Sequence, residues 1–132
     1  MFAQYNLVTI AVAAVTANIV GMLWYSPMLF GNMWMRGVGI NAKNTNMGAQ
    51  HIIGALLVSA SIAFGLTHVT KMFGITNFMD AIKTASMLVM AFVAPTEFLP
   101  VIWGKKDVNV FLINVGHWLV VFSVIACIVV SL

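Results

Sequence analysis

Four long apolar runs limit what this chain can fold into. They lie at about residues 5–25, 49–70, 78–103 and 108–131. Each run is as long as, or longer than, the roughly 20 residues that an α-helix needs to cross about 30 Å of hydrocarbon. Only 7% of the 132 residues are charged, whereas soluble domains carry about 25%, so water could not solvate this surface. We predict an all-α fold, a four-helix transmembrane bundle that forms a single membrane domain over residues 1–132.

The charge distribution argues against a nucleic-acid partner. The net charge is +3, but the six cations are scattered over the connections without a basic run. Orientation in the membrane and contact with anionic headgroups explain such cations better. We expect membrane lipids as partners and, because the chain is short, a homo-oligomer or another membrane protein.

An aromatic stretch follows the first run. Tryptophan and tyrosine rings are apolar, but their N–H and O–H groups favour water, so they prefer the membrane interface. Pro27 disfavours helix at Ser26, and Gly31 allows a tight bend. We predict a structured hinge on the membrane surface between the first two spans. This aromatic hinge, residues 24–34, includes Trp24, Tyr25, Ser26, Pro27, Phe30, Gly31 and Trp34.

Small residues recur every four positions in the first two runs. This spacing is typical of helices that approach each other closely in membranes. We therefore predict that the first and second spans pack together. The residues concerned are Ala13, Ala17 and Gly21 in the first run and Ala55, Ser59 and Ala63 in the second.

Four polar residues within the apolar runs lie at similar depths. Counted at 1.5 Å per residue from the turn at 104–107, Glu97 and Asn114 both lie about 13 Å into the membrane. His117 lies about one turn deeper, and Asn18 approaches the same depth from the first run. We predict that these four side chains form a polar intramembrane cluster, with the aromatic hinge as a lid at its mouth. For Asn18 the alternative is an interhelical hydrogen bond.

Two interpretations of Glu97 compete. A carboxylate in hydrocarbon is costly, so it should face the bundle or water. Its role can be structural: a Glu97 side chain that is neutral or paired with His117 would fix the register of the helices through hydrogen bonds. Alternatively, a Glu–His pair beside Pro95 and Pro100, which interrupt the helical hydrogen-bond ladder, would suit a proton-coupled pathway or a small-ligand site.

Catalytic, metal and cofactor sites are not indicated. Ser26 lacks the G-x-S-x-G context of a nucleophile. His51 and His68 lie about 25 Å apart along one helix, so they cannot share a metal ion. We expect no metal and no cofactor, and enzymatic activity is not indicated.

The cations favour one orientation in the membrane. The connections 26–50 and 104–107 carry Arg36, Lys43, Lys105 and Lys106, whereas the other side carries Lys71 and Lys83. The positive-inside rule then predicts that these two connections are cytoplasmic and that both termini lie outside, in a plasma (inner) membrane.

Motifs near both ends resemble the DUF1761 family of membrane proteins. The segment Trp24-Tyr25-Ser26-Pro27, the pair Phe30-Gly31 and Trp34 resemble its N-terminal signature, and Gly104-Lys105 with residues 111–116 resembles its turn and final helix. Residues 41–98 match in hydropathy alone. The family pattern has Tyr-His where this chain has His117-Trp118, a shift of about 100° around a helix. The resemblance implies a small four-helix membrane protein of unknown function.

These features favour a lipid- or protein-binding scaffolding subunit that works as a homo-oligomer or within a larger membrane complex. The alternative is a homo-oligomeric, proton-coupled transporter or channel for a small solute, with Glu97 as the titrating group. A membrane enzyme acting on a lipophilic substrate is a third hypothesis, without a recognisable catalytic set.

Overall fold

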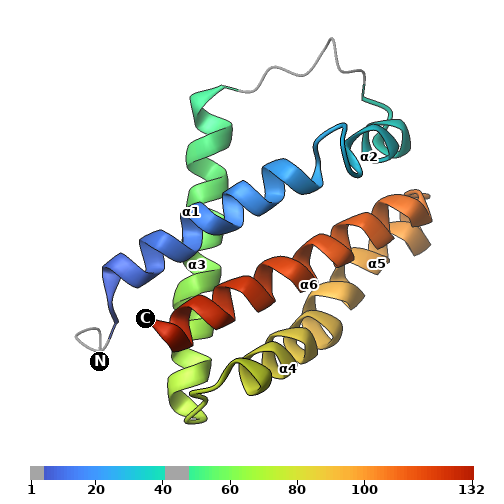
Figure 1. Ribbon diagram of the computed structural model, residues 1–132. Helices are drawn as coiled ribbons and strands as arrows, with labels where there is room; N and C mark the ends of the chain where they lie inside the picture. The colour runs from blue at the N-terminus through green and yellow to red at the C-terminus, as the bar shows by residue number, and fades with distance from the viewer. Residues whose placement is uncertain (1–4, 41–47) are drawn as a thin grey trace.

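The computed structural model describes residues 5–40 and 48–132, so Lys43 lies outside the described part. Within it, the third apolar run is divided by a π-helical turn, and a short helix follows the aromatic hinge (Figure 1). The elements are α1 (Leu7–Trp24), α2 (Gly31–Val38), α3 (Ala49–Met72), α4 (Phe78–Leu88), η3 (Val89–Val93), α5 (Ala94–Trp103) and α6 (Val108–Ser131).

The predicted all-α fold with four spans is confirmed. Four stretches are long and apolar enough to cross a membrane. Their bounds, Leu7–Trp24, Ala49–Met72, Phe78–Trp103 and Val108–Ser131, agree closely with the four apolar runs.

Polar side chains cap the starts of three helices. The Asn6 side chain accepts hydrogen bonds from the amides of Val8 (3.0 Å) and Thr9 (3.4 Å) before α1. Asn77 does the same at the start of α4, and Asp107 at the start of α6. Because the first amides of a helix have no partner within it, these caps determine where each helix begins.

Helices α1 and α6 lie side by side, and α4 and α5 follow the opposite side of α6 (Figure 1). Helix α3 crosses α1 and α6 at a steep inclination. The start of α1 and the end of α6 lie at one end of the molecule. The aromatic hinge, α2, the end of α5 and the start of α6 lie at the other.

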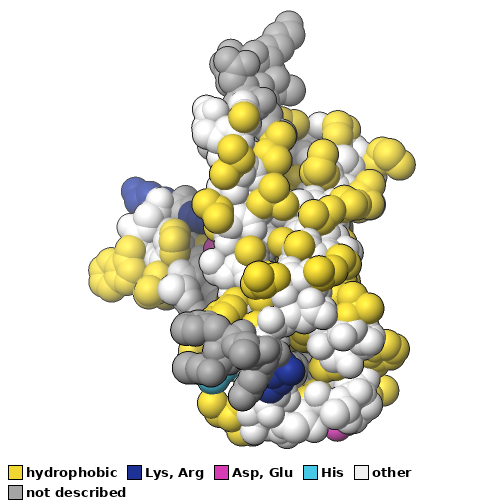
Figure 2. Space-filling view, turned by 90° about the vertical axis from the view of Figure 1, so that its left-hand side faces the viewer, with side chains coloured by type: hydrophobic (Ala, Val, Ile, Leu, Met, Phe, Trp, Pro, Cys, Tyr) yellow, Lys and Arg dark blue, Asp and Glu magenta, His cyan; other side chains and the backbone are white. Residues whose placement is uncertain are grey.

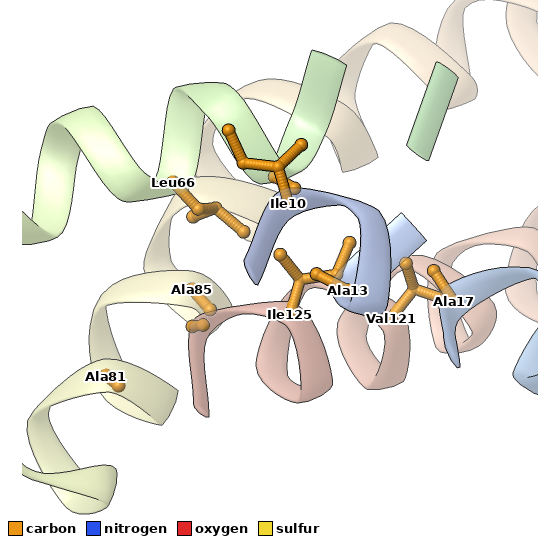
Figure 3. Packing of buried hydrophobic residues seen from close by; sticks show 10 residues of the cluster. Ile10, Ala13, Ala17, Leu66, Ala81, Ala85, Val121 and Ile125 are labelled. Atoms are coloured by element: carbon orange, nitrogen blue, oxygen red, sulfur yellow. The ribbon is translucent and has the colours of Figure 1, made fainter. Parts of the chain in front are cut away.

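The core is built from small residues. Alanines from four helices are buried together with Val121 and Ile125 (Figure 3). Alanine lets helix backbones approach closely, which is how helices associate in a membrane, where lipid removes the hydrophobic driving force. The buried alanines of this cluster are Ala13, Ala17, Ala63, Ala81, Ala85 and Ala126.

Of the six predicted packing residues, four are buried: Ala13, Ala17, Ser59 and Ala63. Ala13, Ala17 and Ala63 belong to the core cluster, and Ser59 bonds to Asn18 of α1. Ala55, by contrast, is exposed. Gly21 faces His117 of α6 and not α3.

The π-helical turn η3 lies immediately before Pro95. The amide of Ala94 bonds to the carbonyl of Val89, five residues earlier, in place of the usual four. Pro95 has no N–H to continue the α-helical ladder, and a π-turn absorbs such an irregularity without ending the helix. The predicted interruption at the prolines is therefore a change of register inside one continuous span.

The outer surface is largely apolar. Hydrophobic side chains spread over the face shown in Figure 2, and few charged side chains interrupt them. Exposed residues of this type occur on all four spans, including Leu23, Leu57, Phe92 and Leu112. This is the surface that a lipid environment requires.

Candidate site at the aromatic hinge

The end of α1 and the middle of α6 interlock through two glycines. A Cβ atom on Gly21 would lie 3.3 Å from Nε2 of His117. On α6, a Cβ atom on Gly116 would lie 3.0 Å from the ring of Trp24. Each helix thus has a glycine where the other has a large ring, and the two backbones approach closely.

Two hydrogen bonds fasten the aromatic hinge to α6. The indole Nε1 of Trp24 donates to the carbonyl of Ile113 at 3.0 Å. The hydroxyl of Tyr25 donates to Oδ1 of Asn114 at 2.7 Å. The rings of Phe30 and Trp34 then pack on Trp24 and Tyr25, with centroids 4.7 and 5.4 Å apart.

The backbone of the hinge folds back on itself at Gly31. Its amide donates to the carbonyl of Ser26 at 2.9 Å, and the amide of Phe30 donates to that of Trp24 at 3.0 Å. A Cβ atom on Gly31 would lie 2.3 Å from the carbonyl oxygen of Tyr25. Glycine is required here because of this close backbone approach, and not because of its dihedral freedom.

Helix α2 was not predicted from the sequence, in which residues 31–38 read as a bend and a glycine-rich loop. It ends at Gly39, whose φ of 75° is left-handed. A glycine just past the last turn commonly ends a helix, so Gly39 is the sequence signal that indicates the end of α2. Gly37 lies against Val110 and so holds α2 on the first turn of α6.

Glu97 joins the hinge through Asn114. The Asn114 amide Nδ2 lies 3.4 Å from Oε2 of Glu97, and Nζ of Lys106 lies 3.6 Å from the same oxygen. Tyr25, Asn114, Glu97 and Lys106 form a continuous chain, which we call the polar network.

The pairing of Glu97 with Lys106 replaces the predicted pairing with His117. Lys105 adopts a left-handed φ of 54°, and the amide of Lys106 bonds to the carbonyl of Pro100 at 3.1 Å. The turn thereby brings Lys106 back over the last part of α5. The side chains of Glu97 and Lys106 are 27% and 28% exposed, so the ion pair is only partly buried.

His117 lies beneath the hinge without a bond to the polar network. It is 8% exposed, and its ring lies 5.0 Å from that of Tyr25 and 4.8 Å from that of Trp118. Within the described residues, its buried Nδ1 has no hydrogen-bond partner.

Asn18, predicted to belong to the cluster, lies elsewhere. Its Nδ2 donates to the carbonyl of Ala14 at 2.8 Å and to the hydroxyl of Ser59 at 3.1 Å. Asn18 therefore makes the interhelical hydrogen bond considered as the alternative, because its side chain points towards α3 and not towards α6. The structure brings Glu97, Asn114 and His117 together around Tyr25.

Among the titratable groups outside the membrane spans, Tyr25 is the one whose pKa this site changes most clearly. Burial, with a further contribution from the negative charge of Glu97, raises the pKa of Tyr25 from 10.0 to about 12. The phenol therefore remains a hydrogen-bond donor to Asn114 at physiological pH.

Metal ligands do not gather in the described part of the chain. Among these residues, no group of three or more His, Cys, Asp and Glu could hold a metal ion.

A family model described as "Protein of unknown function (DUF1761)" matches residues 8–130. Searches of curated proteins and of solved structures found no match. The family match covers the candidate site and the four spans except for Leu7 and Ser131 at their outer ends.

Proposed function

The chain belongs to the DUF1761 family, and we propose that it works in the membrane as a lipid- or protein-binding scaffolding subunit. It acts as a homo-oligomer or within a larger membrane complex. Its partners are membrane lipids and a second membrane protein, which can be another copy of the chain.

The observation that carries this proposal is a contrast between the polar groups near the hinge, which pair with one another, and the outer faces of the helices, which are apolar. The charged and polar groups near the hinge pair with one another, as in Glu97 with Lys106 and Tyr25 with Asn114. The outer faces are apolar: Phe92 is 69%, Leu57 64% and Leu112 59% exposed. Surfaces of this kind contact lipid or another membrane helix.

The outer face of α3 supports a helix–helix contact in particular. A Cβ atom on Gly54 or Gly65 would meet nothing within 4 Å, and Ser61 between them is exposed. Small residues on an exposed membrane helix allow a second helix to approach closely. A second copy of the chain would bury this face.

The same proposal includes an orientation. We place the protein in the plasma (inner) membrane, with the 26–50 and 104–107 connections cytoplasmic and both termini outside. Arg36, Lys105 and Lys106 belong to the hinge end of the chain, and Lys71 and Lys83 to the opposite end, which agrees with the positive-inside rule.

The test is the mass of the assembly after extraction in native nanodiscs without detergent. The wild-type chain should appear as a multimer or with a protein partner. Gly65→Leu should reduce the multimer at least severalfold, because it fills the outer face of α3. The matched control Ala11→Leu enlarges an exposed residue of α1 and should leave the assembly unchanged. A wild-type chain that is strictly monomeric and without a partner would contradict the proposal.

A second candidate function is proton-coupled transport of a small solute, with Glu97 as the titrating group. It is favoured by the polar network, which links α5, α6 and the hinge beside the buried His117. Glu97→Gln keeps the shape and removes the charge. Loss of a pH-dependent flux with normal assembly would support transport, provided that Lys106→Met, which keeps the carboxylate, retains the flux. An unchanged flux with disturbed assembly would support scaffolding.

A further inference from the structure

We propose that His117 is the binding group of an internal site, closed by the aromatic hinge, for one small uncharged molecule that offers a hydrogen-bonding oxygen. Water and the hydroxyl or ester oxygen of a lipid share this chemistry. The inference goes beyond the scaffolding role, because it concerns the interior of the bundle and not its outer faces.

The first argument is the unpartnered nitrogen. His117 is 8% exposed, and its Nδ1 is buried without a hydrogen-bond partner in the described part of the chain. The large majority of buried side-chain polar atoms have a partner, in the protein or in ordered water. In surroundings of low dielectric an unpaired polar group is especially unfavourable. Since no described side chain supplies the partner, we infer that a bound molecule supplies it.

The walls around the imidazole identify the class of ligand. The ring lies 5.0 Å from Tyr25, 4.8 Å from Trp118 and 6.4 Å from Trp24, and its other side faces Gly21. An aromatic face attracts a cation, but it carries no net charge and so cannot neutralise a buried ion. The nearby ionised groups, Glu97 and Lys106, already pair with each other. The ligand is therefore uncharged.

The chemistry of the imidazole points to an oxygen. A neutral histidine has one donor nitrogen and one acceptor nitrogen. Water or a hydroxyl group can donate or accept, so it suits Nδ1 in either tautomer, whereas an ester oxygen suits only the protonated one.

The hinge supplies the entrance. Trp24 and Tyr25, which cover the ring, are held to α6 by single hydrogen bonds to Ile113 and Asn114. Trp24 ends the first span and Tyr25 follows it, at a level where lipid headgroups and water are both available. Because both rings cover the imidazole, the entrance would open when both hydrogen bonds break.

The experiment is nitrogen NMR of the full chain in nanodiscs, with ¹⁵N-labelled histidine and either ordinary or deuterated lipid. The chain has three histidines, and His117→Gln assigns the signal of interest. We expect Nδ1 of His117 to show the shift of a hydrogen-bonded nitrogen, with a cross-peak to water protons or, in ordinary lipid only, to lipid protons. The shift of a free nitrogen, or a cross-peak to the Tyr25 hydroxyl, would overturn the proposal.

Two substitutions test which nitrogen binds. His117→Asn places an amide close to the position of Nδ1, whereas His117→Gln places it close to that of Nε2. With ¹⁵N-labelled amides, the cross-peak should persist in the first variant and disappear in the second. Equal behaviour of two folded variants would contradict binding at Nδ1, and the wild-type spectrum decides the question if either variant fails to fold.

Discussion

At the scale of single residues, glycines determine how the hinge meets the bundle. Gly21 and Gly116 leave room for His117 and Trp24, and Gly31 lies against the backbone of Tyr25 and Ser26. The sequence indicates the hinge through its aromatic residues and Pro27. It does not reveal which ring occupies the space beside which glycine, since that depends on how α1 and α6 are rotated against each other.

Gly31→Ala should destabilise the folded protein. Its Cβ would lie 2.3 Å from the carbonyl oxygen of Tyr25, and backbone cannot move aside as a flexible side chain can. We expect a loss of about 1–3 kcal/mol in the free energy of unfolding, measured by tryptophan fluorescence during SDS titration. The control Gly54→Ala meets nothing within 4 Å and should gain up to about 1 kcal/mol from helix propensity. Equal effects of the two substitutions would show that the hinge does not have this conformation.

The Tyr25 phenol should lose its proton only at a pH well above the usual range for tyrosine. Its pKa in the fold is about 12, above the ordinary 10.0. The fold therefore favours the neutral phenol, and this stabilisation is complete below pH 10 and is lost as the pH rises through 12. Tyr5→Phe leaves Tyr25 as the sole tyrosine, so that absorbance at 295 nm follows it alone. The midpoint of the Tyr25 titration should fall towards pH 10 in a detergent that unfolds the protein. A midpoint near pH 10 in the folded protein would contradict burial of the ring.

At the scale of elements, the four spans follow from hydropathy, because each apolar run is long enough for a helix that satisfies its own backbone in lipid. The irregularities within the spans do not follow from it. Pro95 predicts a disturbed ladder, but whether that disturbance becomes a break or a π-turn depends on the packing of α4 and α5 against α6. The pairing of Lys106 with Glu97 depends likewise on the left-handed conformation of Lys105, a residue type that rarely adopts it.

The polar contact between Asn18 of α1 and Ser59 of α3 can be tested separately. Ser59→Ala removes the hydroxyl that accepts from Asn18 and should cost about 0.6 kcal/mol, the average for interhelical hydrogen bonds in membranes. Ser61→Ala is the matched control, since the Ser61 hydroxyl donates to the carbonyl of Leu57 within its own helix. Both values come from the SDS unfolding assay, and an equal cost for the two serines would argue against the Asn18–Ser59 bond.

At the scale of the whole molecule, an even number of spans places the two termini on the same side of the membrane. Figure 1 shows the start of α1 and the end of α6 at the same end of the bundle. The hinge and the polar network lie at the other end. The number of spans predicts that the termini share one end, whereas the contact of α2 with α6 depends on the three-dimensional packing around Gly37.

The orientation can be measured by thiol labelling. Cys127 is the single cysteine, so Cys127→Ala provides a background for Lys71→Cys and Lys105→Cys. In intact cells a membrane-impermeant maleimide should label position 71 at once, and position 105 only after permeabilisation. The reverse labelling pattern would show that the protein has the opposite orientation in the membrane and would contradict the proposal.

The unequal lengths of the spanning helices have a consequence for the bilayer. Helix α1 has 18 residues and therefore rises about 27 Å, and the polar groups of Asn6 and Tyr25 lie at its two ends. Helices α3 and α6 have 24 residues each, or about 36 Å. A long span adapts to a thin membrane by tilting, whereas a short span favours lipid that is thinner around it. The shortest helix therefore sets the preferred hydrocarbon thickness, and this protein should gather where the membrane is thinnest.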